Sequence, residues 1–447
     1  MQTPKKIAVV GAGLVGSLLA IYLKKAGHIV HVYDRSPDIR KIKFSGRSIN
    51  LAMSNRGWKA LEKIGIADDI KRIGLPMEKR AIHMIDQSLN YQKYGKEGEA
   101  IYSLSRGVLN RKMIDLAEEV GVEFFFEHKV WDVSLEEAIL HIGEEEKGEW
   151  RPYKYDKVFG SDGAFSRVRH RMQRQSMFDY SQDFLEVGYK ELNIPANEDG
   201  SHKLDNSSLH IWPRGNFMLI ALPNLDGSFT CTLFMPFKGD NSFEELDTKE
   251  KLVDFFAKYF PSTQDVIPNL VEDFFRNPKS YLVTMKCFPW THNDTVALIG
   301  DACHAIVPFY GHGMNAGFED ITVLSELMEQ YGDDWQTIFT EYENSRKPNA
   351  DAIAELSYRN FMEMSSKTAD DKFHLQKQIE KWFSGKHPDK WTPLYSRVTF
   401  SHQPYAEALA EGDRQNKIMK EILEIENIEQ IWETEPVEQR ILQLLRE

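Results

Sequence analysis

Hydrophobic residues near the N-terminus follow the pattern of a strand, a helix and a second strand. Residues 6–10 form a short apolar run, a glycine turn follows, and an apolar helical run continues to about residue 26. A second strand is predicted at residues 29–33. The chain is therefore predicted to open with a βαβ unit, the first piece of an α/β domain.

The pattern changes twice further along the chain. Up to about residue 163 it predicts helices at 55–64 and 110–120, strands at 81–84 and 91–103, and a strand pair with an acidic tip at 125–155. From about 180 to 287, alternating runs separated by Gly, Pro, Asn and Asp predict an inserted antiparallel sheet with one helix near 248–260. A strand at 296–299 returns the chain to the α/β domain. After about residue 318 the pattern is helical and includes an acidic amphipathic helix at 417–431, for which packing within the protein is favoured over a partner or membrane surface.

Composition and charge exclude several classes of protein. The 447 residues suffice for two or three domains, and 42% hydrophobic and 28% charged residues are ordinary for a globular protein. A net charge of −13 disfavours broad binding to nucleic acid or to an anionic membrane. The three cysteines are far apart and show no metal-ligand spacing. We therefore expect a soluble cytoplasmic protein without disulfides, bound metal or a membrane anchor.

The glycine turn after the first predicted strand contains Gly11, Gly13 and Gly16 in a G-x-G-x-x-G pattern. Gly11 permits a tight turn, Gly13 lets the backbone approach a pyrophosphate, and Gly16 lets the helix and strand pack closely. Asp34 ends the second predicted strand, where a carboxylate accepts hydrogen bonds from ribose hydroxyls and repels a 2′-phosphate. The motif therefore predicts a bound dinucleotide, FAD or NAD rather than NADP.

Two more pairs of Gly and Asp follow predicted strands. Asp162-Gly163 comes after the apolar run at 157–160, and Gly300-Asp301 comes after the strand at 296–299. An Asp at such a strand end can accept a ribose or ribitol hydroxyl, and the glycine run from Gly311 can begin a helix whose amides face a flavin or its phosphates. Each pair alone is typical of an ordinary turn, so the weight lies in the order of the three motifs.

That order resembles the class A FAD-dependent aromatic hydroxylases, which have a para-hydroxybenzoate-hydroxylase-type fold. Within that group, longer segments are similar to the kynurenine 3-monooxygenase family, at residues 45–57, 210–214, 229–237, 305–309 and 313–320. The resemblance extends from the first predicted strand to about Glu407, nearly the whole chain. It implies an α/β protein with a Rossmann-like FAD-binding domain, an inserted antiparallel-sheet substrate domain and a C-terminal helical region.

The resemblance and the changes of pattern together divide the chain into three parts. The FAD-binding domain is predicted to be discontinuous, at residues 1–76, 98–178 and 288–330. The substrate domain is predicted at 77–97 and 179–287, and the helical region at 331–447.

The resemblance also implies a reaction. NADPH would bind transiently and reduce the bound FAD, and a flavin C4a-hydroperoxide formed with O2 would hydroxylate L-kynurenine to 3-hydroxykynurenine, a step in tryptophan degradation and NAD biosynthesis. A second G-x-G-x-x-G motif in a βαβ setting is absent from the sequence, in agreement with a transient NADPH. This chemistry needs no metal and no catalytic side chain beyond the flavin, although the protein must exclude water and hold the substrate ring near the flavin. The expected partners are L-kynurenine, NADPH and O2, with no nucleic acid, and the expected state is a monomer or homodimer.

Family motifs place the substrate on Arg80, Tyr94, Asn360 and Tyr395. A guanidinium can hold the carboxylate of an amino acid with two parallel hydrogen bonds, which suits Arg80 to this role. Without the resemblance, Arg80 would be interpreted as a surface ion pair with Glu78 and the other three as packing or surface residues. The predicted cofactor contacts, from the glycine motif and the resemblance together, are Gly11, Gly13, Val15, Gly16, Asp34, Arg35, Ala52, Arg106, Asp162, Asp301, Met314 and Asn315.

Two features depart from the family's pattern. His312 stands where the family usually has Gln, which leaves the substrate scope and pH optimum open but not the reaction class. The chain ends in a charged helix at 443–447, without the apolar anchor of the membrane-bound eukaryotic enzymes, so a bacterial-type enzyme is expected. Two alternatives stay open: a related flavin hydroxylase of another aminoaryl acid, and a non-catalytic flavin-binding protein that binds a partner through its acidic C-terminal helix.

Overall fold

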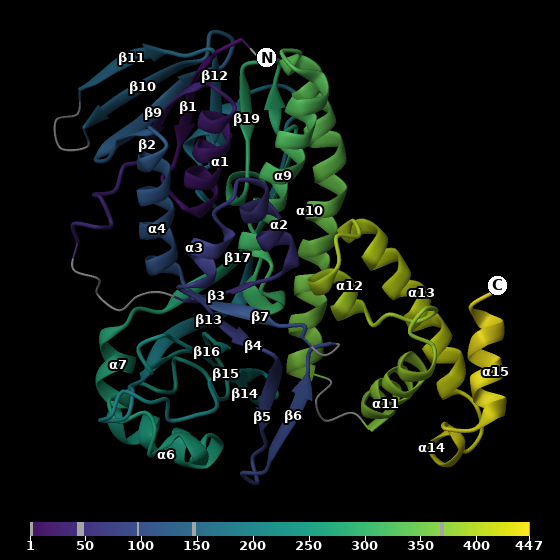
Figure 1. The fold of residues 1–447 in the computed structure, drawn as a ribbon. Helices are drawn as coiled ribbons and strands as arrows, with labels where there is room; N and C mark the ends of the chain where they lie inside the picture. Colours follow the sequence, from purple (N-terminus) through teal and green to yellow (C-terminus); the bar gives the residue numbers. More distant parts are fainter. Residues whose placement is uncertain (1–2, 43–48, 96–97, 145–148, 367–370, 447) are drawn as a thin grey trace.

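A six-stranded sheet forms the core of the N-terminal part of the computed structural model, which describes residues 3–42, 49–95, 98–144, 149–366 and 371–446 (Figure 1). The strand order is β18-β19-β12-β1-β2-β8, and every neighbouring pair is parallel except β18 and β19. The strands are β1 (Lys6–Val10), β2 (Ile29–Tyr33), β8 (Glu123–Phe125), β12 (Lys157–Gly160), β18 (Thr291–His292) and β19 (Val296–Leu298). The predicted βαβ opening is therefore confirmed.

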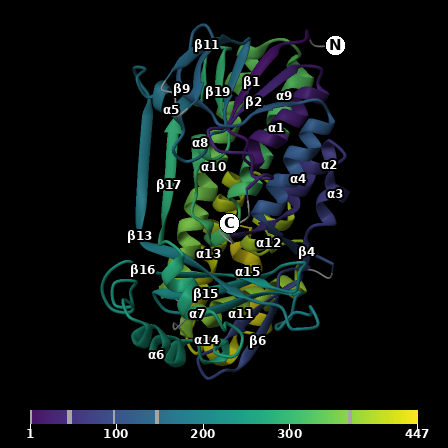
Figure 2. The same cartoon turned by 90° about the vertical axis from the view of Figure 1, so that its left-hand side faces the viewer.

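Helices cover one face of this sheet and a small antiparallel sheet covers the other (Figure 2). Alternate residues of β2 serve the two faces: His31 and Tyr33 share one face, where the Tyr155 hydroxyl lies 3.0 Å from His31 Nδ1 and 2.6 Å from the Tyr33 hydroxyl, and Val32 lies on the other. The helices are α1 (Leu14–Lys25), α4 (Arg106–Glu119) and α9 (Gly313–Tyr331), and the small sheet contains β9 (His128–Ser134), β10 (Ile139–Glu144) and β11 (Trp150–Lys154). The prediction of a strand pair at 125–155 was wrong, since three strands lie there. Ala138 makes the extra turn with a left-handed φ of 52°, without the Gly or Asn that usually signals such a turn.

A three-stranded sheet connects the N-terminal part to the rest of the chain. Its order is β3-β7-β4, and both pairs are antiparallel. The elements here are β3 (Asn50–Met53), α2 (Asn55–Lys63), α3 (Ala67–Lys71), β4 (Leu75–Met77), β7 (Ile101–Ser105) and α5 (Arg167–Met172). The single strand predicted at 91–103 was wrong, because β6 and β7 belong to different sheets. Residues 45–48 of the family-like segment lie outside the described residues.

A seven-stranded sheet forms the lower part of the molecule in Figure 1, in the order β17-β13-β16-β15-β14-β5-β6. Its strands are β5 (Lys79–His83), β6 (Leu89–Lys93), β13 (Asp179–Ile194), β14 (Ser208–Arg214), β15 (Phe217–Pro223), β16 (Phe229–Pro236) and β17 (Ser280–Phe288). Trp212, Leu219 and Leu233 pack on one face with α6 (Lys249–Tyr259), η1 (Pro261–Thr263) and α7 (Leu270–Arg276). Leu209 and Ile220 alternate with them and belong to the opposite face, which these helices leave uncovered.

Helices make up the rest of the chain, and the long α10 runs beside both large sheets (Figure 1). The elements are α8 (Asp301–His304), η2 (Pro308–Tyr310), α10 (Trp335–Ser366), α11 (Asp371–Lys386), α12 (Leu394–Phe400), α13 (Tyr405–Leu423), α14 (Ile428–Ile431) and α15 (Glu435–Leu444). The single helix predicted at 417–431 was wrong: α13 ends at Leu423, and Asn427 takes a left-handed φ of 58° before α14. Ile418 and Ile422 are buried against Ile441 and its neighbours, which supports the packing interpretation. Among the described residues, no helix combines the length and the apolar character needed to cross a membrane.

A network of buried ions joins the end of β19 to helices α9 and α10. The Asp320 carboxylate is 0% exposed and accepts hydrogen bonds from the Gly300 backbone N–H (3.1 Å) and from Arg346 Nε (2.8 Å). It also lies 2.5 Å from His304 Nε2. Burial alone would lower the pKa of His304, but the Asp320 carboxylate outweighs burial and raises that pKa above its ordinary value.

We expect Asp320→Asn to lower the free energy of unfolding by about 3 kcal/mol, because it removes the carboxylate that pairs with His304 and one of the two that pair with Arg346. Urea unfolding of the cofactor-loaded protein measures this loss. Asp389→Asn is the matched control, since Asp389 is exposed. A loss no larger than that of the control would contradict the role of the buried carboxylate.

The raised pKa of His304 also predicts how the contribution of this ion pair depends on pH. A pKa that is higher in the folded than in the unfolded state adds stability below the unfolded value of about 6.5, and this stability is lost as the pH rises through the folded value. The difference in unfolding free energy between the wild type and His304→Gln should therefore be larger at pH 6 than well above the raised pKa. A difference that grows with pH would contradict this assignment.

Candidate functional site

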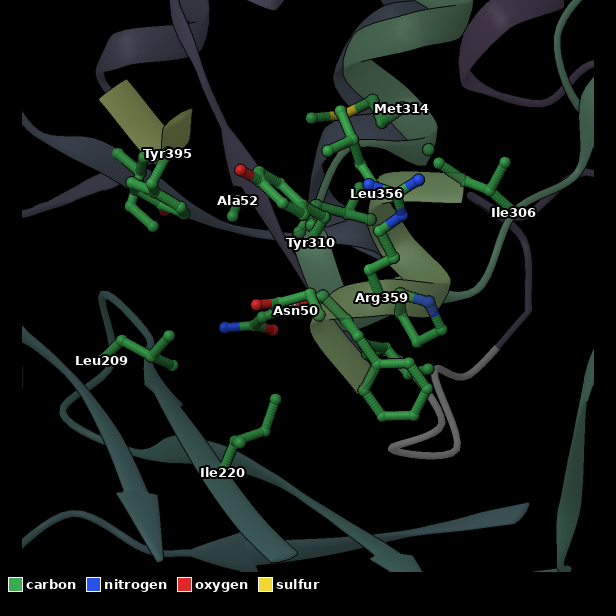
Figure 3. Close-up of a pocket in the computed structure, with 18 of the residues that line it drawn as sticks. Asn50, Ala52, Leu209, Ile220, Ile306, Tyr310, Met314, Leu356, Arg359 and Tyr395 are labelled. Carbon is green, nitrogen blue, oxygen red and sulfur yellow. Dashed lines mark hydrogen bonds between the residues drawn. The ribbon is translucent and has the colours of Figure 1, made fainter. Parts of the chain in front are cut away.

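A connected cavity of about 2550 Å³ separates the N-terminal part from the uncovered face of the seven-stranded sheet. It runs from the glycine turn after β1, past the loop before α9, to the helices α10–α13. Typical small-molecule pockets have roughly 300–1,000 Å³, so this cavity has room for a dinucleotide and a second, smaller ligand. Figure 3 shows its central portion, with Leu209 and Ile220 rising from the sheet toward Tyr310 and Ala52.

The glycine turn is closed on one side and open on the other. A Cβ on Gly11 would lie 2.6 Å from the Ser161 carbonyl oxygen, and one on Gly16 would lie 2.0 Å from the Gly11 carbonyl oxygen. A Cβ on Gly13 would meet nothing within 4 Å, and Gly13 lines the cavity where α1 begins. The first and third glycines therefore serve close packing, while the middle one leaves space for a phosphate at the helix N-terminus.

Acidic side chains meet the cavity at three strand ends. Asp34 follows β2, and its carboxylate accepts hydrogen bonds from the backbone N–H groups of Ala12 and Ser36, both at 2.8 Å. Asp162 accepts hydrogen bonds from the Ser166 hydroxyl (2.5 Å) and the Arg167 N–H (2.6 Å). Asp301 begins α8 and is exposed to the cavity. The carboxylates of Asp34 and Asp301 are thus placed to accept hydroxyl groups of a bound nucleotide, whereas Asp162 also holds the turn before α5.

Most of the other predicted cofactor residues line the same cavity: Val15, Arg35, Ala52, Arg106 and Met314. Gly16 and Asn315 do not line it. The Asn315 side chain donates to the carbonyls of Ala52 (2.8 Å) and Gly311 (3.0 Å) and accepts from the Ser54 N–H (2.9 Å). Asn315 therefore ties β3 to the loop before α9.

The residues around the upper part of the cavity fit a FAD. The space over Gly13, the carboxylate of Asp34 and the exposed guanidinium of Arg106 match the charges of phosphates and ribose. The Asn50 Oδ1 atom is buried beside the cavity and has no partner among the described residues, so it is an acceptor that a ligand can satisfy.

A partly buried cation, the guanidinium of Arg80, lines the other end of the cavity. The Arg80 guanidinium carbon is 4.9 Å from the ring centre of Tyr94 and 4.3 Å from that of Tyr395, and the two rings stack 5.5 Å apart. We call Arg80, Tyr94 and Tyr395 the clamp. No carboxylate in the described part of the chain pairs with Arg80, so the ion pair with Glu78 considered above is not formed. A cation held between aromatic faces without a counter-ion can bind the carboxylate of a ligand.

Asn360 reaches the cavity from α10, but part of its amide serves the protein itself. Its Nδ2 atom donates a hydrogen bond to the Phe309 carbonyl at 2.7 Å. The structure thus brings all four predicted substrate residues to one cavity, and it adds for Asn360 the role of holding the loop before α9.

The sequence did not single out the apolar walls between the clamp and the glycine turn. Leu209 is the register partner of Arg80 in the parallel pair β5–β14, and Ile82 follows Arg80 on the same face of β5. Other side chains of these walls are Ile211, Met218, Ile220, Leu222, Phe234, Ile306, Phe309, Tyr310 and Leu356. The alternation of Met218, Ile220 and Leu222 along β15 was the available signal, but a pattern of period 2 does not say which face of a sheet meets a ligand.

One group of potential metal ligands exists among the described residues: Cys303, His304 and Asp320. The Asp320 carboxylate already pairs with the guanidinium of Arg346. Since that cation would repel a metal ion, we interpret the group as part of the buried ionic network.

Comparisons with known proteins agree with this cavity. The model of the FAD binding domain family matches residues 5–357. Solved structures of similar fold include 2-methyl-3-hydroxypyridine-5-carboxylic acid oxygenase, with a TM-score of 0.68, 20% identity, and coverage of 82% of this chain and 94% of that one. Another is Pseudomonas aeruginosa PqsL in complex with 2-aminobenzoylacetate, with a TM-score of 0.66, 18% identity, and coverage of 81% and 97%. These two establish the fold alone.

Closer relatives match the whole chain. The kynurenine 3-monooxygenase of Flavobacterium johnsoniae is 74% identical over 446 residues, which cover 100% of both chains. That of Dictyostelium discoideum is 41% identical over 433 residues, 94% of this chain and 93% of its own. With a FAD-binding model over most of its length and full-length identity of this order, the chain belongs to the kynurenine 3-monooxygenase family.

Proposed function

We propose that this protein uses FAD, NADPH and O2 to hydroxylate L-kynurenine to 3-hydroxykynurenine. The observation that carries the substrate is the Arg80 cation between Tyr94 and Tyr395, which pairs with no carboxylate of the described residues and lies in the same cavity as the glycine turn. Kynurenine joins an amino-acid head to an aminoaryl ketone, and these two ends suit the clamp and the apolar walls, respectively. The kynurenine 3-monooxygenase relatives support the same substrate.

The cofactor would be held by Gly13, Asp34 and Arg106 on the nucleotide side and by Ala52 and Met314 near its reactive end. When bound, FAD supplies the electron transfer from NADPH and the activation of O2. The chain's own contribution is to bind the cofactor and the substrate, to orient the substrate and to exclude water from the cavity.

Orientation of the substrate comes from opposite ends of the cavity. Arg80 would hold the carboxylate by parallel hydrogen bonds, with the hydroxyls of Tyr94 and Tyr395 beside it. Leu209, Ile220 and their neighbours would surround the aryl ring and leave little space for water. Fixing both ends of the substrate limits the positions of its ring relative to the cofactor.

The cytoplasm is the compartment that we propose, because Cys231, Cys287 and Cys303 are all free and buried. We expect a monomer or homodimer, with NADPH bound only transiently.

The substrate prediction is tested by following NADPH oxidation and product formation with the purified yellow protein. L-Kynurenine should accelerate NADPH oxidation and become hydroxylated. 2-Aminoacetophenone, which keeps the aminoaryl ketone but lacks the amino-acid head, should be about 100-fold less effective in kcat/KM, because it leaves the clamp without its anion. No product from L-kynurenine would refute the proposed function, whereas hydroxylation of a different aminoaryl acid would favour the related hydroxylase considered above. A colourless protein without flavin would contradict both.

The role of Arg80 is tested by substitution. Arg80→Gln should raise the KM for L-kynurenine about 100-fold, and Arg80→Lys should raise it about tenfold, because an ammonium keeps the charge but not the two parallel hydrogen bonds. The flavin spectrum and the low activity on 2-aminoacetophenone should not change, since neither involves a carboxylate. Arg72→Gln is the control, because the Arg72 side chain is 76% exposed. An unchanged KM in Arg80→Gln would remove Arg80 from the substrate site.

A further inference from the structure

The loop from Pro308 to Gly313 lies between the candidate cofactor site and the clamp, and among the described residues the hydrogen bonds of three side chains hold it. Asn360 donates to the Phe309 carbonyl, and Asn315 donates to the Gly311 carbonyl. The third contact is made by His312, whose side chain is 2% exposed and does not line the cavity, although its neighbours Gly311 and Gly313 do. His312 therefore points away from the ligand space and into the protein.

Both ring nitrogens of His312 meet hydroxyl groups of the C-terminal helices. Nδ1 lies 2.9 Å from the Tyr405 hydroxyl at the start of α13, and Nε2 lies 3.4 Å from Thr399 Oγ1 near the end of α12. Both partners are buried. One side chain thus links the loop to two helices that follow it by about 90 residues in the chain.

The contacts of His312 do not depend on a positive charge on its ring. Burial, with the Arg56 cation nearby, lowers the pKa of His312 to about 3, so the ring is neutral under ordinary conditions. The other groups against it are the hydroxyls of Tyr405 and Thr399 and the ring of Tyr310. A neutral imidazole offers one donor and one acceptor, and a hydroxyl can match either, so the contact is a pair of hydrogen bonds that does not titrate.

Tyr405 is held in place by burial and by a contact with Arg56. Its ring is 0% exposed and lies 3.9 Å from the guanidinium carbon of Arg56. Arg56 donates to the Val398 carbonyl (3.0 Å) and pairs with Glu319, which also pairs with Arg346 (2.7 Å). The hydroxyl that holds His312 is therefore connected to the buried ionic network.

The clamp depends on the same helix. Tyr395 and Thr399 are four residues apart on α12 and so share one side of that helix. Tyr395 forms the clamp with Arg80, and its ring stacks on that of Tyr310 at 5.6 Å. The Tyr310 ring in turn meets the His312 ring edge-on at 5.6 Å.

From these contacts we propose that His312 is a positioning residue for the hydroxylation proposed above. With Tyr405 and Thr399 it fixes the loop at residues 308–313 to the helix that carries Tyr395, and so sets the distance between the clamp and the cofactor. The inference rests on the proposed function, because that distance matters only if a ligand in the clamp reacts at the cofactor. Loss of the link should misplace the ring while leaving the carboxylate bound.

The test compares His312→Leu and Tyr405→Phe, which both remove the 2.9 Å hydrogen bond, with His312→Gln, whose amide still offers a donor and an acceptor. In the FAD-loaded protein, the first two should lower the yield of 3-hydroxykynurenine per NADPH consumed about tenfold, with the KM for L-kynurenine changed much less. His312→Gln should stay within about twofold of the wild type. Tyr281→Phe is the matched control, because Tyr281 is 67% exposed and does not line the cavity.

A second readout does not use activity. Amide hydrogen exchange at residues 309–313 should be faster in Tyr405→Phe than in the wild type, both with and without FAD, and unchanged in Tyr281→Phe. Wild-type yield in both His312→Leu and Tyr405→Phe would overturn the proposal while the proposed function stands. Equal losses in kcat and in substrate affinity would also overturn it, because they indicate general disorder of the site. A wild type that makes no 3-hydroxykynurenine would overturn the function itself.

Discussion

One buried carboxylate, that of Asp320, connects the turn that faces the cofactor site to the helices behind it. It accepts the Gly300 N–H and pairs with His304 and Arg346, so three donors depend on a group that water does not reach. Any replacement that cannot accept these bonds leaves donors buried and unsatisfied, which costs more than the bonds themselves contribute. The position of Asp301, one residue after Gly300 and exposed to the cavity, is thus set by helices α9 and α10.

Arg80, which is partly buried and lines the cavity, differs from the buried cations Arg346 and Arg56. Arg346 pairs with Glu319 and Asp320, and Arg56 pairs with Glu319. This is expected, because a charged group buried away from water needs a partner of opposite charge. Arg80 has aromatic faces around it but no carboxylate among the described residues. Aromatic rings offset only part of the lost hydration of a guanidinium, which supports the proposal that an anionic ligand binds here.

The sequence predicted those parts of the fold that local pattern determines. The strands at Lys6–Val10 and Ile29–Tyr33 and the role of Gly11 follow from apolar runs and a turn that only glycine makes easily. It failed at two turns: Ala138 is left-handed without the Gly or Asn that usually signals such a turn, and the signal that Asn427 offers was not read as the end of a helix. The family motifs located the clamp. No pattern in a single sequence could reveal that the Asn315 side chain makes its hydrogen bonds to the end of β3 and to the loop before α9.

The two ends of the cavity share one support. From Asp320 the contacts pass through Arg346, Glu319 and Arg56 to Tyr405, and from there through His312 and Tyr310 to Tyr395 beside Arg80. The first half consists of ion pairs and a cation on an aromatic face, and the second half consists of a neutral hydrogen bond and stacked rings. Tyr310 and Tyr395 line the cavity, but the members of the chain from Asp320 to His312 do not, so the spacing of the site depends largely on groups that the ligands do not touch. A shift of about 1 Å at a reacting atom can cost about 100-fold in rate, so selection on the reaction reaches residues well outside the cavity.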